Sequence, residues 1–182
     1  MFNKIFQAQT KVQNWSIAMI SPIFKSGIEM DPGNYRGISV LSCLSKLFTS
    51  VLNQRLLKYV IDNKILNKAQ LGFVSGNRTS DAHIILHNLL QLQCHSKGRN
   101  VYSCFIDFRK AFDSIPRDKL FEKLVSIGID GKFFNNLKII YQNDICQVKT
   151  INGLTDCFTA NQGVKQGCIL SPLLFRKYSC RP

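Results

Sequence analysis

The sequence has no long apolar segment. No stretch reaches the roughly 18 continuous apolar residues that a membrane-spanning helix requires. Residues 1–15 alternate polar and apolar side chains and include Lys4 and Lys11, so they lack the apolar centre of a secretory signal. We therefore expect an intracellular protein that is not secreted.

The cysteines and histidines lack the spacing of a metal site. The seven cysteines are odd in number, widely scattered and without a Cys-x-x-Cys pair, which is typical of free thiols in a reducing compartment. His83 and His87 lie four residues apart, which could suit a metal. On an apolar helical segment without a partner carboxylate, we instead expect structural or solvent-facing histidines.

Acidic residues are few. The chain has 11 Asp and Glu against 24 Lys and Arg, which gives a formal net charge of +13 over 182 residues. This excess indicates a polyanionic partner such as nucleic acid or an anionic membrane face. A solvated basic surface explains the composition equally well. Because hydrophobic residues make up 45%, the chain can bury a core, and its length suits about one domain.

Hydrophobic spacing predicts an α+β domain. Apolar residues recur at helical intervals in four segments, and turn residues bound them. The predicted helices span 44 to about 62, 79 or 80 onward, 116–128 and 131–141. A further helix is expected to begin at Ser171-Pro172.

The remaining segments predict strands and loops. The apolar run 15–24 suits a strand, and the turn residues of 26–37 suit a loop. The β-branched and aromatic run 101–106 predicts a buried strand. Asn152-Gly153, which lies between 145–151 and 154–160, predicts a hairpin.

Asp107 is the first candidate for chemistry, because it directly follows the predicted strand 101–106. A carboxylate at a strand end suits a hard cation such as Mg²⁺. A turn-forming aspartate or a helix cap is the competing interpretation. Asp113, six residues further on, has the same two interpretations and favours the structural one.

Two other regions present polar side chains on loops. Gly163 and Gly167 bracket Lys165 and Gln166, and such a loop lets a ligand approach the backbone closely, although a plain turn before a helix fits equally well. Lys25 and Arg36 lie in predicted loops, where isolated cations are ordinarily solvated. They would matter in phosphoryl transfer, which needs cations beside the leaving triphosphate.

Five segments occur in an order that resembles the reverse transcriptases of LINE-type (non-LTR) retrotransposons, relatives of the group II intron enzymes. They are SPIFKSG, NYRGISVLSCLSK, QLGFVSGNRTSDA, FIDFRKAFDSI and GVKQGCILSPLLF. The resemblance covers about residues 17–175. It implies the fingers (about 17–99) and a partial palm (about 100–175) of an α+β right-hand polymerase, without palm hairpin or thumb, and a divergent tail over 176–182.

The resemblance also implies roles for palm residues. Asp107 matches the catalytic aspartate that binds both metal ions, and Phe108 matches the residue whose main-chain carbonyl touches a metal. Phe112 matches the aromatic steric gate that excludes a ribose 2′-OH.

Other matched positions concern the nucleotide and the template. Lys25 and Arg36 match the fingers that hold the incoming triphosphate, and Arg78 matches the template-binding part of the fingers. The loop residues Lys165, Gln166 and Gly167 match the motif that lies under the nucleotide and the template base. Ile169 stands where the family more commonly has proline.

The resemblance implies that the complete enzyme extends a DNA primer on an RNA template, using deoxynucleoside triphosphates and two Mg²⁺ (or Mn²⁺) ions, with no membrane partner. The family's second metal-binding element, an aromatic-x-Asp-Asp turn, follows the last matched segment, but here nothing acidic follows Asp156. We therefore expect a fragment with an incomplete two-metal site that is inactive as an isolated chain. The alternative is a non-enzymatic nucleic-acid-binding relic of a degenerate element.

Overall fold

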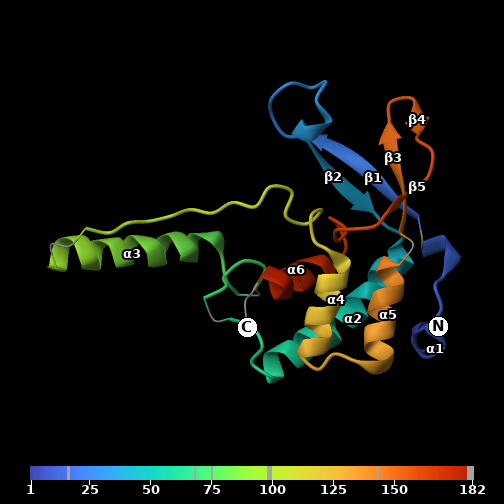
Figure 1. Ribbon diagram of the computed structural model, residues 1–182, viewed down its shortest axis with the longest axis horizontal. Helices are drawn as coiled ribbons and strands as arrows, with labels where there is room; N and C mark the ends of the chain where they lie inside the picture. The colour runs from blue at the N-terminus through green and yellow to red at the C-terminus, as the bar shows by residue number, and fades with distance from the viewer. Residues whose placement is uncertain (16, 68, 75, 98–99, 143, 180–182) are drawn as a thin grey trace. The chain divides into compact units, whose positions relative to one another are not determined.

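A computed structural model describes residues 1–15, 17–67, 69–74, 76–97, 100–142 and 144–179 (Figure 1). The chain forms two compact units. The first comprises Met1–Ile65 and Lys110–Pro182, and the second comprises Leu66–Arg109. The division into fingers and palm that the resemblance implies stays a prediction, because these units follow different bounds.

The first unit is rich in helices. They are α1 (Phe2–Ala8), α2 (Cys43–Asp62), α4 (Arg117–Ser126), α5 (Gly131–Tyr141) and α6 (Ser171–Ser179), with short 3₁₀ turns η1 (Gln13–Trp15) and η2 (Pro32–Asn34). The sequence predicted α2, α4, α5 and the start of α6. It did not predict α1, which is short and has no fully buried residue.

The sheet of the first unit combines antiparallel and parallel pairing. Its strands are β1 (Ile17–Phe24), β2 (Tyr35–Val40), β3 (Asp144–Thr150), β4 (Gly153–Leu154) and β5 (Phe158–Ala160). They lie in the order β2-β1-β3-β4, and β5 also pairs with β3. β1 is antiparallel to β2 and parallel to β3, so the parallel pair joins segments that are far apart in the sequence.

The strand predictions are partly confirmed. β1 and the β3–β4 hairpin form as expected, and the second hairpin strand is split into β4 and β5. β2 begins inside the segment that was predicted to be a loop. Proline has no N–H to donate in a sheet, but Pro22 of β1 lies opposite Gly37, beyond the part of β1 (Ile17–Ile20) that pairs with β3. Pro22 therefore costs no hydrogen bond to β3.

The predicted strand over 101–106 is wrong. Residues 101–108 have no strand hydrogen bonds, and every one of them is exposed. A strand needs a partner for its backbone groups, and among the described residues the five strands pair only with one another. The apolar composition of this segment therefore favours a strand, but the described part of the chain offers no partner strand for it.

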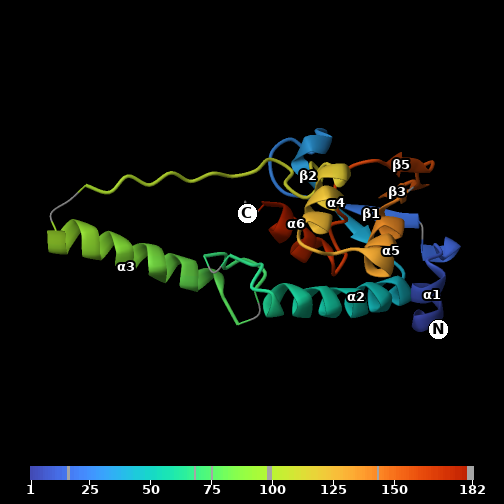
Figure 2. The same ribbon diagram turned by 60° about the horizontal axis from the view of Figure 1, so that its bottom comes forward.

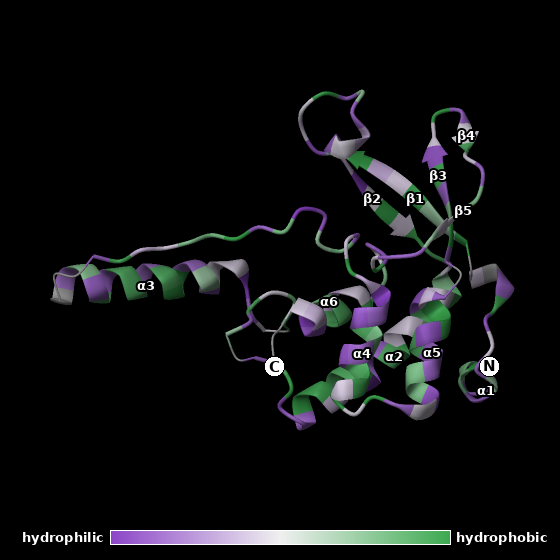
Figure 3. Ribbon diagram, viewed as in Figure 1, coloured by the Kyte–Doolittle hydropathy of each residue, from purple (hydrophilic) through white to green (hydrophobic). Residues whose placement is uncertain are grey.

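The core of the first unit lies between its helices. Figures 1 and 2 show α2 beside α4 and α5, and Figure 3 shows hydrophobic residues along these helices. α2 buries Phe48, Leu52, Leu56 and Val60, which repeat at helical spacing. The Tyr59 hydroxyl donates to the Ile127 carbonyl oxygen (2.9 Å) and ties α2 to the α4–α5 connection.

The second unit consists of α3 (Thr79–Lys97) and the segments beside it. The carboxylate of Asp81 accepts a hydrogen bond from the Arg78 backbone N–H (2.6 Å), which satisfies a donor at the start of the predicted helix. His83 and His87 are exposed, which agrees with the solvent-facing interpretation. No helix in the described ranges combines the length and apolar character needed to cross a membrane.

The cysteines are free thiols wherever the structure describes them, which agrees with the prediction. Cys180 lies outside the described residues, as does the end of the predicted tail.

Candidate nucleotide-binding site

Two of the segments singled out in the sequence lie side by side in the first unit. The turn that contains Phe112 and the loop that begins at Gly163 are joined by two backbone hydrogen bonds. Gly163 N–H donates to the Ile115 carbonyl oxygen (2.8 Å), and Val164 N–H donates to the Phe112 carbonyl oxygen (2.9 Å). These bonds fix the loop against the turn, so side chains from both segments reach one surface.

Glycine is required at both ends of this loop. Gly163 has a φ of +80°, and a Cβ there would lie 2.8 Å from the Asp113 carbonyl oxygen. Gly167 has a φ of +117°, and a Cβ there would lie 2.5 Å from the Ser39 carbonyl oxygen. The Ser39 N–H also donates to the Gln166 carbonyl oxygen (2.6 Å). The loop is thus held closely between the turn and β2.

Replacing Gly167 by alanine is expected to cost about 1–3 kcal/mol of stability more than the same change at Gly153. Gly153 has a φ of +118°, close to that of Gly167, but nothing lies within 4 Å of its Cβ position. The backbone strain is therefore matched, and only Gly167→Ala adds the collision with Ser39. Urea unfolding of the two variants measures the difference, and equal losses would show that the close approach to β2 is not rigid.

The Gln166 side chain is half-buried and is oriented by Asp113. Its Nε2 donates to both Asp113 carboxylate oxygens at 3.3 Å. Asp113, which the sequence favoured as a structural residue, therefore contacts a predicted nucleotide-binding residue. The amide oxygen is left as the acceptor of the Gln166 side chain, because Nε2 supplies the donors.

Lys165, a predicted nucleotide-binding residue, does not present its charge to solvent. Its side chain is only 7% exposed, and Nζ lies 2.8 Å from Asp144 Oδ1. Burial of an ammonium group requires such a partner. Lys165 therefore fixes the loop to the start of β3.

Arg117 is the main residue that sequence reasoning missed. It is buried, and all its nitrogens donate. Nε donates to Gly163 O (2.9 Å), and the other acceptors are Tyr141 O (2.5 Å), Ala160 O (2.7 Å), Gln162 O (3.3 Å) and Asp144 Oδ2 (3.3 Å). Arg117 is in the first turn of α4, where a cation opposes the helix dipole. This unfavourable placement was the signal in the sequence that Arg117 has a special role.

Asp144 is the anion of a buried cluster that also contains Arg117 and Lys165. Its side chain is 1% exposed and contacts both cations. Lys11 lies near this cluster and donates to the Gln142 carbonyl oxygen (2.8 Å). Partial burial lowers the pKa of Lys11, Asp144 opposes that shift, and the cations Lys165 and Arg117 add to it. The cluster therefore carries more positive than negative charge.

A cavity of about 270 Å³ lies beside the loop and the cluster. Its walls include Gly37, Ser39, Asp113 and Gln166, and the Arg117–Asp144 pair also lines it. Small-molecule sites usually span about 300–1,000 Å³, so this volume suits part of a ligand rather than a whole nucleotide.

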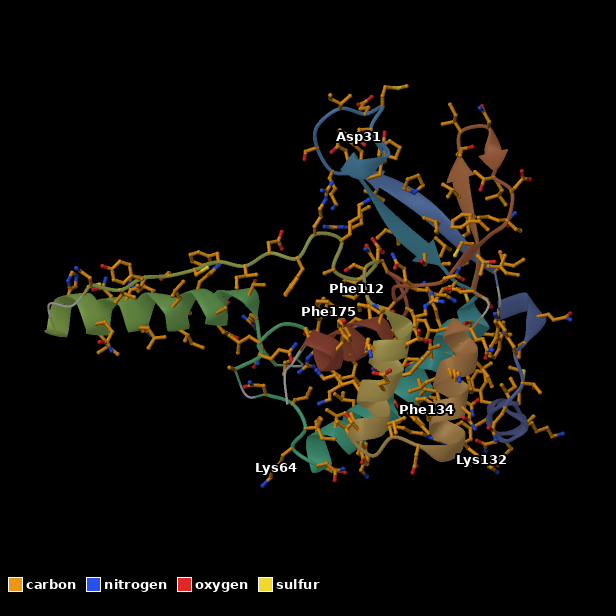
Figure 4. All side chains as sticks on the ribbon, in the orientation of Figure 1. Asp31, Lys64, Phe112, Lys132, Phe134 and Phe175 are labelled. Carbon is orange, nitrogen blue, oxygen red and sulfur yellow. The ribbon has the colours of Figure 1, made fainter. Side chains whose placement is uncertain are left out.

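Lys25 and Arg36 lie on the β1–β2 hairpin, whose tip is near Asp31 in Figure 4. Lys25 follows β1, and its N–H donates to the Asn34 carbonyl oxygen (2.9 Å). Arg36 lies in β2 opposite Ile23, so the prediction that it lies in a loop is wrong. Both side chains are exposed, which leaves them accessible to an anionic ligand.

Asp107, Phe108 and Arg78 belong to the second unit and are exposed. Phe108 is 65% exposed. Within the described ranges, no three His, Cys, Asp or Glu side chains gather where they could hold a metal ion. The residues present do not assemble a two-metal site by themselves, and we assign no catalytic step to a metal.

Phe112 lies against Phe175 of α6. The two rings are stacked, with centroids 4.9 Å apart and planes inclined by 21°, and Figure 4 shows both side chains. Both rings are half-buried. The predicted steric gate is therefore packed on one side by a helix of the same unit.

A family model described as "Reverse transcriptase (RNA-dependent DNA polymerase)" matches residues 23–179. The chain belongs to the reverse transcriptase family. The identity predicted from the five ordered segments is confirmed.

Curated relatives of this reverse transcriptase chain come from non-LTR retrotransposons. It is 30% identical over 181 residues to the probable RNA-directed DNA polymerase from transposon BS of Drosophila melanogaster, covering 98% of this chain and 20% of that protein. It is 25% identical over 178 residues to the RNA-directed DNA polymerase from mobile element jockey of Drosophila funebris, covering 96% and 19%. The chain thus spans about a fifth of the length of these relatives.

A solved structure supports the fold. The chain of an apo telomerase from Candida tropicalis, truncated from its C-terminal domain, matches with a TM-score of 0.57 at 18% identity. The match covers 97% of the reverse transcriptase chain and 41% of the telomerase chain. The predicted α+β class and partial polymerase fold are confirmed.

Proposed function

We propose that this chain is the nucleotide-binding and template-binding portion of an RNA-directed DNA polymerase that extends a DNA primer on an RNA template. The observation that carries the proposal is the junction of the Phe112 turn with the Gly163–Gly167 loop. Backbone hydrogen bonds and the close approach of Gly163 to Asp113 hold these segments together, and Gly167 lies equally tightly against Ser39 of β2. Such preorganisation is what a site that positions a reacting nucleotide requires.

In this proposal, the predicted residues of the first unit have different roles. Lys25 and Arg36 neutralise the triphosphate, which is anionic and benefits from cations at its leaving group. Gln166 and Gly167 form the surface under the nucleotide and the template base, and Phe112 excludes a 2′-OH. Lys165 acts indirectly, because its ion pair with Asp144 holds the loop in place.

The remaining predicted residues lie in the second unit, and the proposal gives each of them a role. Asp107 supplies a carboxylate for the reaction, Phe108 supplies its main-chain carbonyl, and Arg78 contacts the template. All three are exposed and accessible to nucleic acid. A complete Mg²⁺ or Mn²⁺ site would need further carboxylates beyond those that the described residues bring together.

A second candidate is nucleic-acid binding without catalysis. The single predicted catalytic carboxylate and the incomplete metal site favour it. This candidate shares the basic surface of the first proposal but predicts no extension of a primer, even when the polymerase is completed.

Binding of an RNA–DNA duplex is expected to weaken as salt rises. The net charge of +13 attracts phosphates, and the logarithm of the affinity should fall linearly with that of the salt concentration. Changing Lys25 and Arg36 together to glutamine should reduce the slope by about one for each phosphate that these side chains neutralise. Fluorescence anisotropy at several salt concentrations measures both quantities.

The control for this measurement is Lys119→Gln. Lys119 is exposed but pairs with Glu122 at 2.9 Å, so its replacement removes the same kind of charge outside the proposed site. The slope should then stay close to that of the unchanged chain. Affinity that is independent of salt, or tighter binding to anionic vesicles than to nucleic acid, would contradict the proposed use of the basic surface.

A further inference from the structure

We infer that Phe175 is a positioning residue that fixes the orientation of the Phe112 ring and thereby sets discrimination between deoxyribose and ribose nucleotides. The inference rests on the proposed function of Phe112 as a steric gate. Phe175 itself touches no reacting atom in this account. Its role is to hold another side chain in the position where exclusion works.

Hydrogen bonds fix the backbone at Phe112, but they do not determine the orientation of its ring. The Phe112 carbonyl oxygen accepts from Val164 N–H, and the Asp113 and Ser114 N–H groups both donate to the Lys110 carbonyl oxygen (2.9 and 3.0 Å). These bonds define the turn. A phenylalanine side chain still rotates about χ1 and χ2 unless packing selects one orientation, and its χ2 preference is broad.

The Phe175 ring provides that packing. The distance of 4.9 Å and the angle of 21° describe a stacked pair, in which the ring faces lie against each other. Because the Phe112 ring is half-buried, part of it remains accessible for contact with a ligand. Phe175 therefore supports one side of the gate.

The support is rigid because α6 is anchored on several sides. Leu174, which adjoins Phe175, is 1% exposed. The hydroxyls of Ser171 and Tyr141 lie 3.3 Å apart in the buried interior. The Lys123 ammonium group donates to the Tyr178 carbonyl oxygen (3.0 Å), which joins α4 to α6. The Phe175 ring therefore projects from a fixed helix.

Phe175 and the nucleotide-facing loop are also part of one continuous segment. Gly167 ends the loop, and α6 begins four residues later at Ser171. The same segment therefore carries the proposed surface under the nucleotide, through Gln166, and the support of the gate, through Phe175. A shift of one would move the other.

The test compares deoxynucleotide with ribonucleotide incorporation in an extended polymerase. The extended polymerase is a fusion protein in which residues 1–182 are followed by the C-terminal remainder of the polymerase domain of a relative, such as the jockey enzyme. Phe175→Leu is expected to lower the preference for deoxynucleotides by roughly 2- to 10-fold, the range that corresponds to losing one aromatic pair. Phe175→Tyr keeps a ring and should retain the preference.

Two further variants make the outcome specific. Phe112→Ala removes the gate itself and should lower the preference at least as much as Phe175→Leu. Phe134→Leu breaks another aromatic pair of the first unit, that with Phe121, whose centroid distance is 5.8 Å. It controls for general destabilisation and should leave the preference unchanged.

The outcomes separate the inference from the proposed function. If Phe112→Ala lowers the preference and Phe175→Leu does not, the positioning role is overturned and the gate stands. If Phe112→Ala has no effect, the proposed gate itself fails.

A second measurement requires no turnover. In the 182-residue chain with ¹³C-labelled phenylalanine, the ring current of Phe175 should shift the Phe112 ring signals upfield. Those signals should move toward unstructured values in Phe175→Leu but not in Phe134→Leu. Unchanged Phe112 signals in Phe175→Leu would overturn the inference.

Discussion

Primer extension by the 182-residue chain alone is expected to fall below detection. Asp107 is the only carboxylate that the family resemblance places in the chemistry, and the described residues contain no cluster that could hold a metal ion. The chain spans only about a fifth of the length of its curated relatives, and we expect positioning of the primer to need more of the polymerase than that. Orientation of reactants alone supplies roughly 7–11 kcal/mol of barrier reduction.

The size of this lost barrier reduction sets how slow primer extension becomes. Each 1.36 kcal/mol in the barrier changes a rate about tenfold, so loss of orientation alone would slow extension by several orders of magnitude. An assay with RNA template, DNA primer and Mg²⁺ or Mn²⁺ should show no product from the short chain and product from the extended polymerase. Product from the short chain that disappears in Asp107→Asn would mean that 182 residues are enough.

Replacing Arg117 by methionine is expected to destabilise the first unit by about 3–5 kcal/mol, the range for removing one partner of a buried ion pair. Arg117 makes five hydrogen bonds, four of them to backbone carbonyl oxygens. Methionine leaves those acceptors and the buried Asp144 carboxylate without this donor. Because whole domains are stable by only about 5–15 kcal/mol, the loss approaches unfolding.

Urea unfolding measures this loss, with Lys119→Met as the control. Lys119 is exposed and pairs with Glu122 on the surface, so its replacement should leave stability nearly unchanged. Asp144→Asn provides a second variant, since it leaves the Arg117 and Lys165 cations buried without their anion. A loss below about 1 kcal/mol in both Arg117→Met and Asp144→Asn would show that the cluster does not stabilise the fold.

The Arg117 cluster links stability to the candidate site. Arg117 Nε donates to the Gly163 carbonyl oxygen, and Lys165 lies in the same loop. The paired buried charges therefore act together with the backbone hydrogen bonds to Phe112 and Ile115 in holding the loop beside the turn. A variant that weakens the cluster is expected to disturb nucleotide binding before it unfolds the chain.

Local sequence patterns predicted the helices well, because burial of one helix face repeats along the chain. α2 buries residues at intervals of three and four, and α5 has the predicted bounds Gly131–Tyr141. Strands depend on partners from elsewhere, so they were predicted less well. β2 was missed because Gly37 suggested a loop, although it pairs with Pro22. The segment 101–106 has the composition of a strand, but none of the described strands pairs with it.

The candidate site was predictable where a local motif carries it. The two glycines around Gln166 predicted close approach of a ligand to the backbone, which stays a prediction. In the structure, it is Asp113 and Ser39 of the chain itself that leave no room for a Cβ at these glycines. Arg117 and Asp144 were missed because their pairing depends on long-range contacts, including the parallel alignment of β1 with β3. The same long-range contacts explain why Lys165 is buried against Asp144, which its place in a loop did not reveal.

The central claim is that residues 1–182 carry one part of a polymerase active site. Single-nucleotide incorporation by the extended polymerase on an RNA template, with and without Asp107→Asn, tests it most directly. We predict that Asp107→Asn lowers the rate by at least about 10²–10³-fold, the loss seen when one electrostatic contact to a reacting group is removed. Asp118→Asn, which changes an exposed carboxylate of α4, should leave the rate unchanged. Equal rates for the Asp107→Asn and unchanged proteins would contradict the account.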